Sequence, residues 1–102
     1  MFERFTSFGG EIRKMHKKRR IEYAKQVQDD TPMGYHDPIE DDPLFNGFLQ
    51  AAESDTEEAL RNAKRGRGFC HRFWRTKQTI LARKYGVIWF SPSEMNPQIL
   101  FD

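Results

Sequence analysis

The amino-acid sequence predicts a mostly α-helical fold: a small irregular bundle of three to four helices, with one short extended segment near residues 87–90. The chain has 102 residues, which suits a single domain, 1–102, with one modest core. Long stretches lack Gly and Pro and are rich in helix-forming residues. Aromatic residues make up 14% of the chain but hydrophobic residues only 37%, so we expect a few large side chains to fill the core.

The first 42 residues predict an arm, a helix and a loop. Phe2, Phe5 and Phe8 recur at a three-residue spacing before two glycines break the pattern, so residues 1–10 are a candidate apolar docking arm. Residues 11–28 predict a helix with a thin apolar stripe and basic residues all around it. Residues 29–42 predict an acidic, Pro-containing loop, since each residue before a proline is pushed toward extended geometry.

Residues 43–64 carry two helix signals. Asp42 and Pro43 are typical of an N-cap followed by proline at the first helical position, and they predict a helix over residues 43–52. That helix would gather Leu44, Phe45, Phe48 and Leu49. Residues 54–56 offer caps for a further helix to about residue 64, and one continuous helix through Ser54 is the alternative.

The strongest predicted element covers residues 69–85 and ends at Gly86, a good left-handed terminator. Its helical wheel shows two apolar stripes, so we expect it to contact two neighbours. One stripe consists of Phe69, Phe73, Thr76 and Ile80, and the other of Cys70, Trp74, Leu81 and Tyr85. Lys77 and Lys84 lie between the stripes and either reach solvent or meet acids from the middle of the chain.

The C-terminal residues predict three short pieces. Residues 87–90 are apolar and β-type, either as one strand or as extended chain that plugs the core. Residues 91–94 read as a capping box with proline at the first helical position. Residues 98–102 form an apolar tail, in which Ile99 and Phe101 are candidate docking residues for the core or for a partner.

Charge is segregated along the chain, although the net charge is only +2. Residues 1–30 hold eight Lys or Arg and five acids, residues 31–60 hold eight acids and no base, and residues 61–85 hold nine bases and no acid. Such blocks raise the local potential far above what the net charge suggests. Two alternatives follow: the acidic block folds back onto the basic helices, or a basic face stays open for an anionic partner.

The residue patterns do not predict an enzyme, a metal site or a cofactor. Glu40, Asp41 and Asp42 cluster on a polar loop, where we expect them to be solvated with ordinary acidity. Cys70 and His71 are one adjacent pair without the further ligands that structural zinc needs. No Gly-rich phosphate loop is present. We therefore expect no catalytic residues and no small-molecule substrate.

The sequence favours a non-enzymatic binding protein that acts through a protein partner, as an accessory subunit, inhibitor or assembly factor. The alternative is a nucleic-acid-binding protein that uses the basic region 61–84. The candidate contact residues are Lys17, Lys18, Arg19, Arg20, Arg65, Arg67, Arg72, Arg75 and Arg83. The single cysteine excludes an internal disulfide, and no apolar run is long enough to span a membrane. We expect a soluble cytoplasmic protein.

Overall fold

The computed structural model describes residues 12–101, so the candidate arm with Phe2, Phe5 and Phe8 lies outside the described residues. The described part is helical and contains no strand, which confirms the predicted fold class. Its elements are α3 (Lys17–Val27), the 3₁₀ helix η1 (Pro38–Asp41), α4 (Pro43–Ala59), α5 (Phe69–Ile80), the π-helical turn η2 (Leu81–Tyr85) and α6 (Pro92–Met95).

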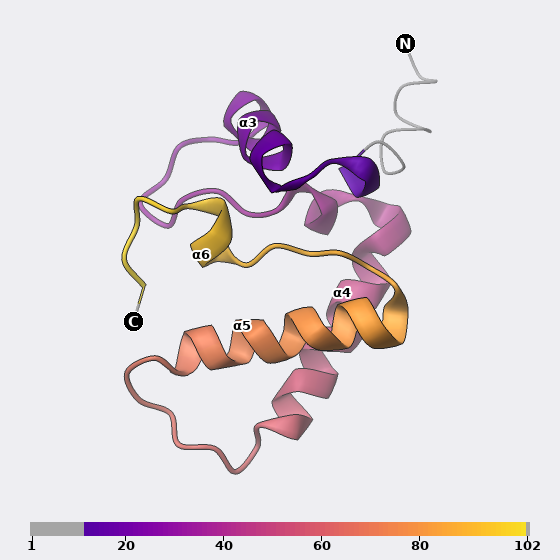
Figure 1. The fold of residues 1–102 in the computed structure, drawn as a ribbon, viewed down its shortest axis with the longest axis vertical. Coiled ribbons are helices and arrows are strands. Elements are labelled where there is room, and N and C mark those ends of the chain that lie inside the picture. The colour runs from indigo at the N-terminus through magenta and orange to yellow at the C-terminus, as the bar shows by residue number, and fades with distance from the viewer. Residues whose placement is uncertain (1–11, 102) are drawn as a thin grey trace.

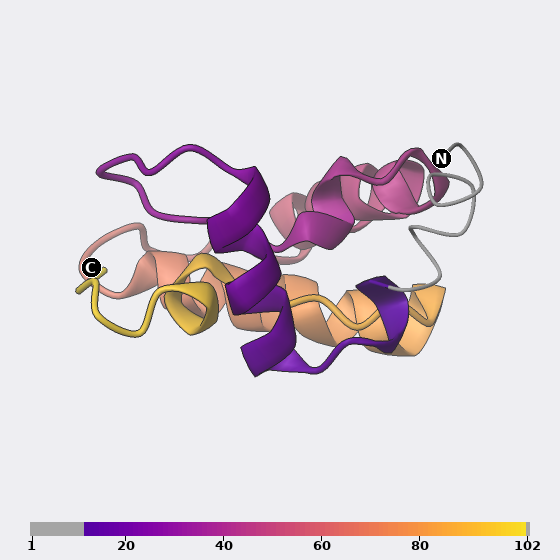
Figure 2. The same cartoon turned by 90° about the horizontal axis from the view of Figure 1, so that it is seen from above.

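The helices lie on two sides of an extended segment, residues 86–91 (Figure 1). On one side, α3 packs on α6 and η1; on the other, α5 packs on α4, which also contacts η1 and η2. The view from above shows α3 crossing over this segment (Figure 2). The core lies between the layers. It consists of Ile12, Ile39, Phe45, Leu49, Ala52, Leu81, Val87 and Trp89.

The helix predicted over residues 11–28 is interrupted in the structure. Residues 12–14 form one helical turn, and α3 begins only after His16, whose backbone is extended and whose Nδ1 accepts a hydrogen bond from the Arg19 amide at 3.3 Å. The break frees the carbonyls of Arg13 and Met15, and both accept hydrogen bonds from the Arg20 guanidinium. The interruption thus lets Ile12 enter the core while Arg20 is buried on the next element.

In α4 the continuous alternative is correct, because one helix runs through Ser54 from Pro43 to Ala59. Asp42 caps it as predicted: its side chain accepts from the Leu44 amide at 2.9 Å. The buried positions Phe45, Leu49, Ala52 and Thr56 follow a helical repeat. The predicted cluster of four apolar side chains is divided, since Phe45 and Leu49 enter the core whereas Leu44 and Phe48 remain exposed.

The element predicted over residues 69–85 is α5 continued by η2, and it ends at Gly86, whose φ of 68° is left-handed. Residues 87–90 are extended chain rather than a strand, with Val87 and Trp89 pointing into the core and Ile88 exposed. The predicted capping box is present, because Ser91 and Glu94 cap α6 reciprocally.

The C-terminal tail and one loop close the molecule at the α6 end. The Phe101 ring packs edge-on against Trp74 at 5.3 Å between centroids, so the tail docks on its own chain. The buried Asn96 holds the backbone of Tyr35 through two hydrogen bonds. Gly34 is required there, because it has a φ of 82° and a Cβ would lie 2.5 Å from the Asn96 Oδ1.

None of the helices among residues 12–101 has the length and apolar character needed to cross a membrane.

Candidate interaction surface

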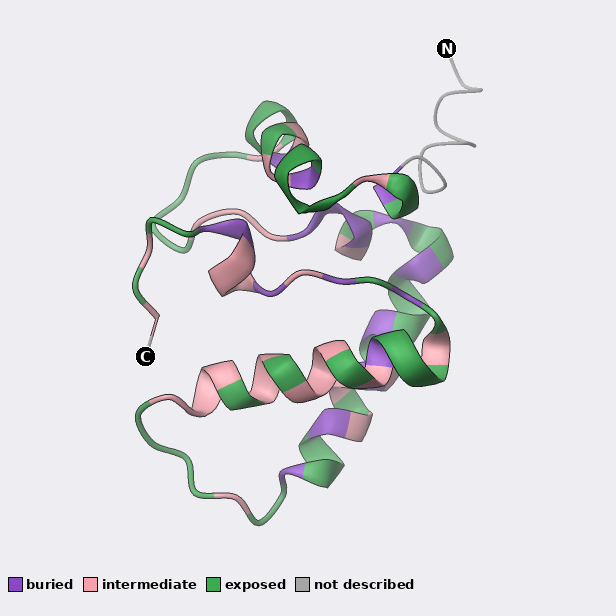
Figure 3. Cartoon of the chain, viewed as in Figure 1, coloured by how far each residue is buried: buried purple, intermediate pink, exposed green. Residues whose placement is uncertain are grey.

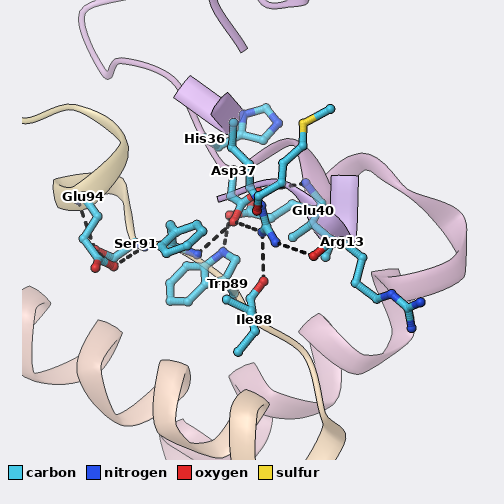
Figure 4. A network of polar contacts seen from close by, with 12 residues as sticks. Arg13, His36, Asp37, Glu40, Ile88, Trp89, Ser91 and Glu94 are labelled. Atoms are coloured by element: carbon cyan, nitrogen blue, oxygen red, sulfur yellow. Dashed lines mark hydrogen bonds and ion pairs between the residues drawn. The ribbon is translucent and has the colours of Figure 1, made fainter. Parts of the chain in front are cut away.

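Arg20 is a buried structural residue, so its prediction as a contact residue is wrong. Its side chain has no exposed surface, and its Nη1 donates to Asp37 Oδ2 at 2.7 Å and to the Ile88 carbonyl at 2.8 Å. Arg13, Asp37 and Ile88 are labelled in the close view of this network (Figure 4). The guanidinium also lies over the Phe90 ring, 4.9 Å from its centroid. Four segments of the chain therefore meet at this one cation.

The acids of the predicted loop are not all solvated, which corrects a second expectation. Asp37 is buried and accepts from the amides of Ile39 and Phe90. Asp42 is buried as a helix cap. Glu40 accepts a 2.6 Å hydrogen bond from the indole of Trp89. Only Asp41 of the predicted trio is exposed, and it contacts His36 at 2.7 Å.

Burial raises the pKa of the Glu40 carboxyl above its ordinary value, although the Trp89 hydrogen bond and the charge of Lys77 oppose the shift. Burial likewise raises the pKa of Asp37, against the effect of Arg20. A raised carboxyl pKa means that the folded state binds the proton more tightly than the unfolded state. The stabilisation that these two carboxyl groups contribute by binding protons is therefore fully present at pH values below their ordinary pKa. It is lost as the pH rises through their pKa in the folded state.

The acids of α4 pair with the bases of α5 and η2. Lys77 contacts Glu53 and Lys84 contacts Asp55, both at 2.9 Å, so both lysines meet acids of α4, and Lys84 also remains exposed to solvent. Hydrogen bonds from Lys84 and from the Tyr85 hydroxyl lower the pKa of Asp55, and the bond to Asp55 raises the pKa of Lys84. The acidic block therefore folds back onto one face of the basic helix, as the first alternative predicted.

A shallow groove of about 420 Å³ lies beside these pairs, between η1, α4 and α5. Glu40, Glu53 and Lys77 line it with neighbouring polar side chains of α4. Each of the three is already engaged: Glu40 by Trp89, and Lys77 by Glu53 and by the Trp89 ring, whose centroid is 4.5 Å from its Nζ. The charges in the groove thus hold the fold together.

Most of the bases remain exposed and form no ion pair with another described residue. Twelve of the sixteen Lys and Arg in residues 12–101 are in this state, against four of the twelve acids. The bases are Arg13, Lys14, Lys17, Lys18, Arg19, Lys25, Lys64, Arg65, Arg67, Arg72, Arg75 and Arg83; the acids are Glu22, Asp29, Asp30 and Glu57. Part of the basic block is therefore neutralised while a larger part stays open, so both alternatives hold, on different faces.

Two groups stand out among the open bases. One surrounds the start of α3, where Lys17, Lys18 and Arg19 occupy the first turn and no acid is present. Bases there are unfavourable, because that end of a helix carries partial positive charge. The second group follows α5: Arg72, Arg75 and Arg83 form a row about 16 Å long at 1.5 Å per residue. We call these three residues the α5 basic row.

The aromatic side chains near the α5 basic row are half-buried against their own chain. The rings of Phe69 and Phe73 lie 6.1 Å apart, and the Arg65 guanidinium covers Phe69 at 4.7 Å. Trp74 contacts His71 and Phe101 edge-on. His71 also forms a hydrogen bond of 2.8 Å between its Nε2 and the Phe101 carbonyl. Trp74 and His71 thus belong to the packing of the C-terminal tail.

No protein family, no curated protein and no solved structure matches this chain. Among the described residues, no three His, Cys, Asp or Glu side chains gather as ligands for a metal ion.

Proposed function

We propose that this chain is a non-enzymatic binding protein that contacts an acidic surface of a protein partner, as an accessory subunit, inhibitor or assembly factor. One observation carries the proposal: among the described residues, twelve exposed bases lack an ion pair with another described residue, whereas only four exposed acids do. The potential outside the molecule is therefore far more positive than a net charge of +2 suggests. Such a surface attracts and orients an anionic partner.

Two further features support a protein partner. Exposed apolar side chains accompany the bases, among them Leu44, Phe48, Ile88 and Leu100, and protein interfaces combine apolar residues with arginine. The three bases in the first turn of α3 work against helix stability. A residue choice that opposes the helix dipole, with no ion pair among the described residues to offset it, is typical of a functional position.

Nucleic acid is the second candidate, and the α5 basic row is the observation that favours it. Its length of about 16 Å covers about five phosphates of one DNA strand. Base stacking receives less support, because Phe69, Phe73 and Trp74 are half-buried and engaged with their own chain. Contacts from this row would therefore be to phosphates, without sequence readout.

The α5 basic row can be tested by replacing Arg72 and Arg75 with glutamine. We expect the double variant to bind a protein partner captured from native extract about tenfold more weakly at low salt, because two steering charges are lost. The matched control is Lys25→Gln with Arg61→Gln, which removes the same charge from other places. Stability should change by less than about 0.5 kcal/mol per site, since exposed positions are tolerant.

The same pair of variants separates the two candidates. Isothermal titration of the purified chain with duplex and single-stranded DNA over a range of salt measures any phosphate contacts. If DNA is the partner, loss of Arg72 and Arg75 flattens the log–log salt slope by about 1.8 for a duplex. No binding to either DNA at low salt removes the second candidate. Equal losses from the test and control variants would contradict the role of the α5 basic row.

A further inference from the structure

Helix α3 contributes little to the hydrophobic core. Only two of its residues, Arg20 and Ala24, are buried, and Ala24 is the one apolar side chain of the two. Tyr23 packs against the core from outside, whereas α4 buries Phe45 and Leu49. Figure 3 accordingly shows most of α3 in the colour of exposed residues. Because an alanine buries far less apolar area than phenylalanine or leucine, the hydrophobic effect holds α3 more weakly than α4.

The chain is anchored on both sides of α3 by residues outside the helix. Before it, Ile12 belongs to the core cluster and has no exposed surface. After it, Tyr35 is held through its backbone by two hydrogen bonds to Asn96. The helix itself packs mainly on η1 and α6, which have four residues each, and it crosses over the extended segment (Figure 2). Residues Lys17–Val27 can therefore leave without moving either anchor, and we call them the α3 lid.

Polar contacts close the α3 lid. Arg20 ties it to η1 through Asp37 and to the extended segment through the Ile88 carbonyl. At its C-terminal end, Gln28 binds both backbone groups of His36: its Nε2 donates to the carbonyl at 2.8 Å, and its Oε1 accepts from the amide at 3.1 Å. When the lid opens, all these groups regain hydrogen bonds to water, so their net contribution to closure is far smaller than their number suggests.

We propose that the α3 lid opens as a unit while η1, α4, α5 and the extended segment stay folded. A helix of eleven residues is marginal on its own in water, so the lid loses its helical hydrogen bonds when it leaves. Opening exposes the groups that Arg20 covers, which are the Asp37 carboxylate, the Ile88 carbonyl and the Phe90 ring. The inference concerns a motion of the free chain, so it goes beyond the proposed function and does not depend on it.

Native-state hydrogen exchange of the full chain, followed by NMR in low urea, tests the opening. We expect the helical amides of the α3 lid to exchange about a hundredfold faster than the slowest amides of α4, after correction for intrinsic rates, with a weaker dependence on urea. The Phe90 amide should share the opening equilibrium of the lid. It donates to Asp37 Oδ2 at 2.8 Å, and that carboxylate becomes hydrated once Arg20 has left.

Two variants separate lid opening from global unfolding. Gln28→Ala removes the two hydrogen bonds to His36, so it should speed the exchange of the lid, of the Phe90 amide and of α4 about tenfold each. Trp74→Ala weakens packing outside the lid, so it should speed α4 about tenfold and leave the lid unchanged. Gln26→Ala is the matched control for Gln28, because this neighbouring glutamine is exposed, and its rates should stay within about twofold of the wild type.

Three results would overturn the inference. Lid amides that exchange as slowly as those of α4, with the same urea dependence, would show that α3 leaves only in global unfolding. Equal acceleration of the lid and of α4 by Trp74→Ala would show the same. If the lid amides opened while the Phe90 amide kept the protection of α4, α3 would only fray in place.

Discussion

Replacement of Arg20 by alanine is expected to destabilise the protein by about 3–5 kcal/mol, since it leaves the buried Asp37 carboxylate without its counterion. The Ile88 carbonyl loses a donor at the same time, and so do two carbonyls before α3. A domain of this size has a total stability of about 5–15 kcal/mol. The variant should therefore be close to unfolding at 25 °C, as urea denaturation followed by circular dichroism would show.

Arg19→Ala is the matched control, because the neighbouring arginine is exposed and forms no ion pair with another described residue. Its unfolding free energy should stay within about 0.5 kcal/mol of the wild type. Double replacement of Arg20 and Asp37 by leucine should be less harmful than Arg20→Ala alone, since no isolated charge remains. An Arg20→Ala protein as stable as Arg19→Ala would show that the buried ion pair does not form.

Trp89→Ala is the second severe change, with an expected cost of about 3–5 kcal/mol. The side chain is 2% exposed in the centre of the core, so truncation leaves a large cavity. It also removes the donor to Glu40 and the ring below the Lys77 ammonium. Trp89→Phe keeps most of the packing but not the hydrogen bond, and should cost about 1–3 kcal/mol. Denaturation in urea measures both.

Trp74→Ala provides the comparison for Trp89. Trp74 is half-buried: it packs against the core cluster from outside and contacts the rings of His71 and Phe101. Its loss should therefore cost about 1–2 kcal/mol, in proportion to the area that it buries. The wheel predicted Trp74 as a core residue, and the structure gives the larger role to Trp89. Equal costs for the two alanine variants would contradict this assignment of the core.

Local signals in the sequence predicted much of the helical fold. Three features depend only on residues a few positions apart: the helix end at Gly86, the Asp42 cap and the Ser91–Glu94 capping box. Each can therefore be recognised in a short stretch of sequence. The separation of acidic and basic blocks also gave, as one of two alternatives, contacts between lysines of residues 69–85 and acids of the middle segment, and Lys77 and Lys84 make such contacts. These features required no knowledge of the tertiary arrangement.

The polar interior could not be predicted in the same way. Arg20 stands in a run of four bases and resembles its neighbours in sequence, yet its partners Asp37 and Ile88 lie 17 and 68 positions away. Glu40 stands in a polar stretch of the sequence, yet it is half-buried and bonded to Trp89, which lies 49 positions away. One signal was present: Arg20 precedes Ala24 by one helical turn, and both lie on the buried face of α3.

The candidate surface was predicted in part. Eight of the nine predicted basic contact residues are exposed, all except Arg20. Of the apolar candidates, Phe101 packs on Trp74 within the chain, and Phe2, Phe5 and Phe8 lie outside the described residues. The exposure of Leu44 and Phe48 was missed because a helical wheel groups them with Phe45 and Leu49. Only the packing of η1, α5 and the extended segment decides which side of that group is covered.

The basic surface depends on acids of residues 31–60, such as Glu40 and Asp55, being bonded within the fold while most bases remain exposed. Carbon-13 NMR titration of the side-chain carboxyl groups tests this most directly. Burial should make Glu40 titrate above its ordinary pKa, and the hydrogen bonds from Lys84 and Tyr85 should make Asp55 titrate below its own. If both groups titrated at the ordinary values of exposed Glu and Asp, these two acids would be solvated, which would contradict their pairing within the fold.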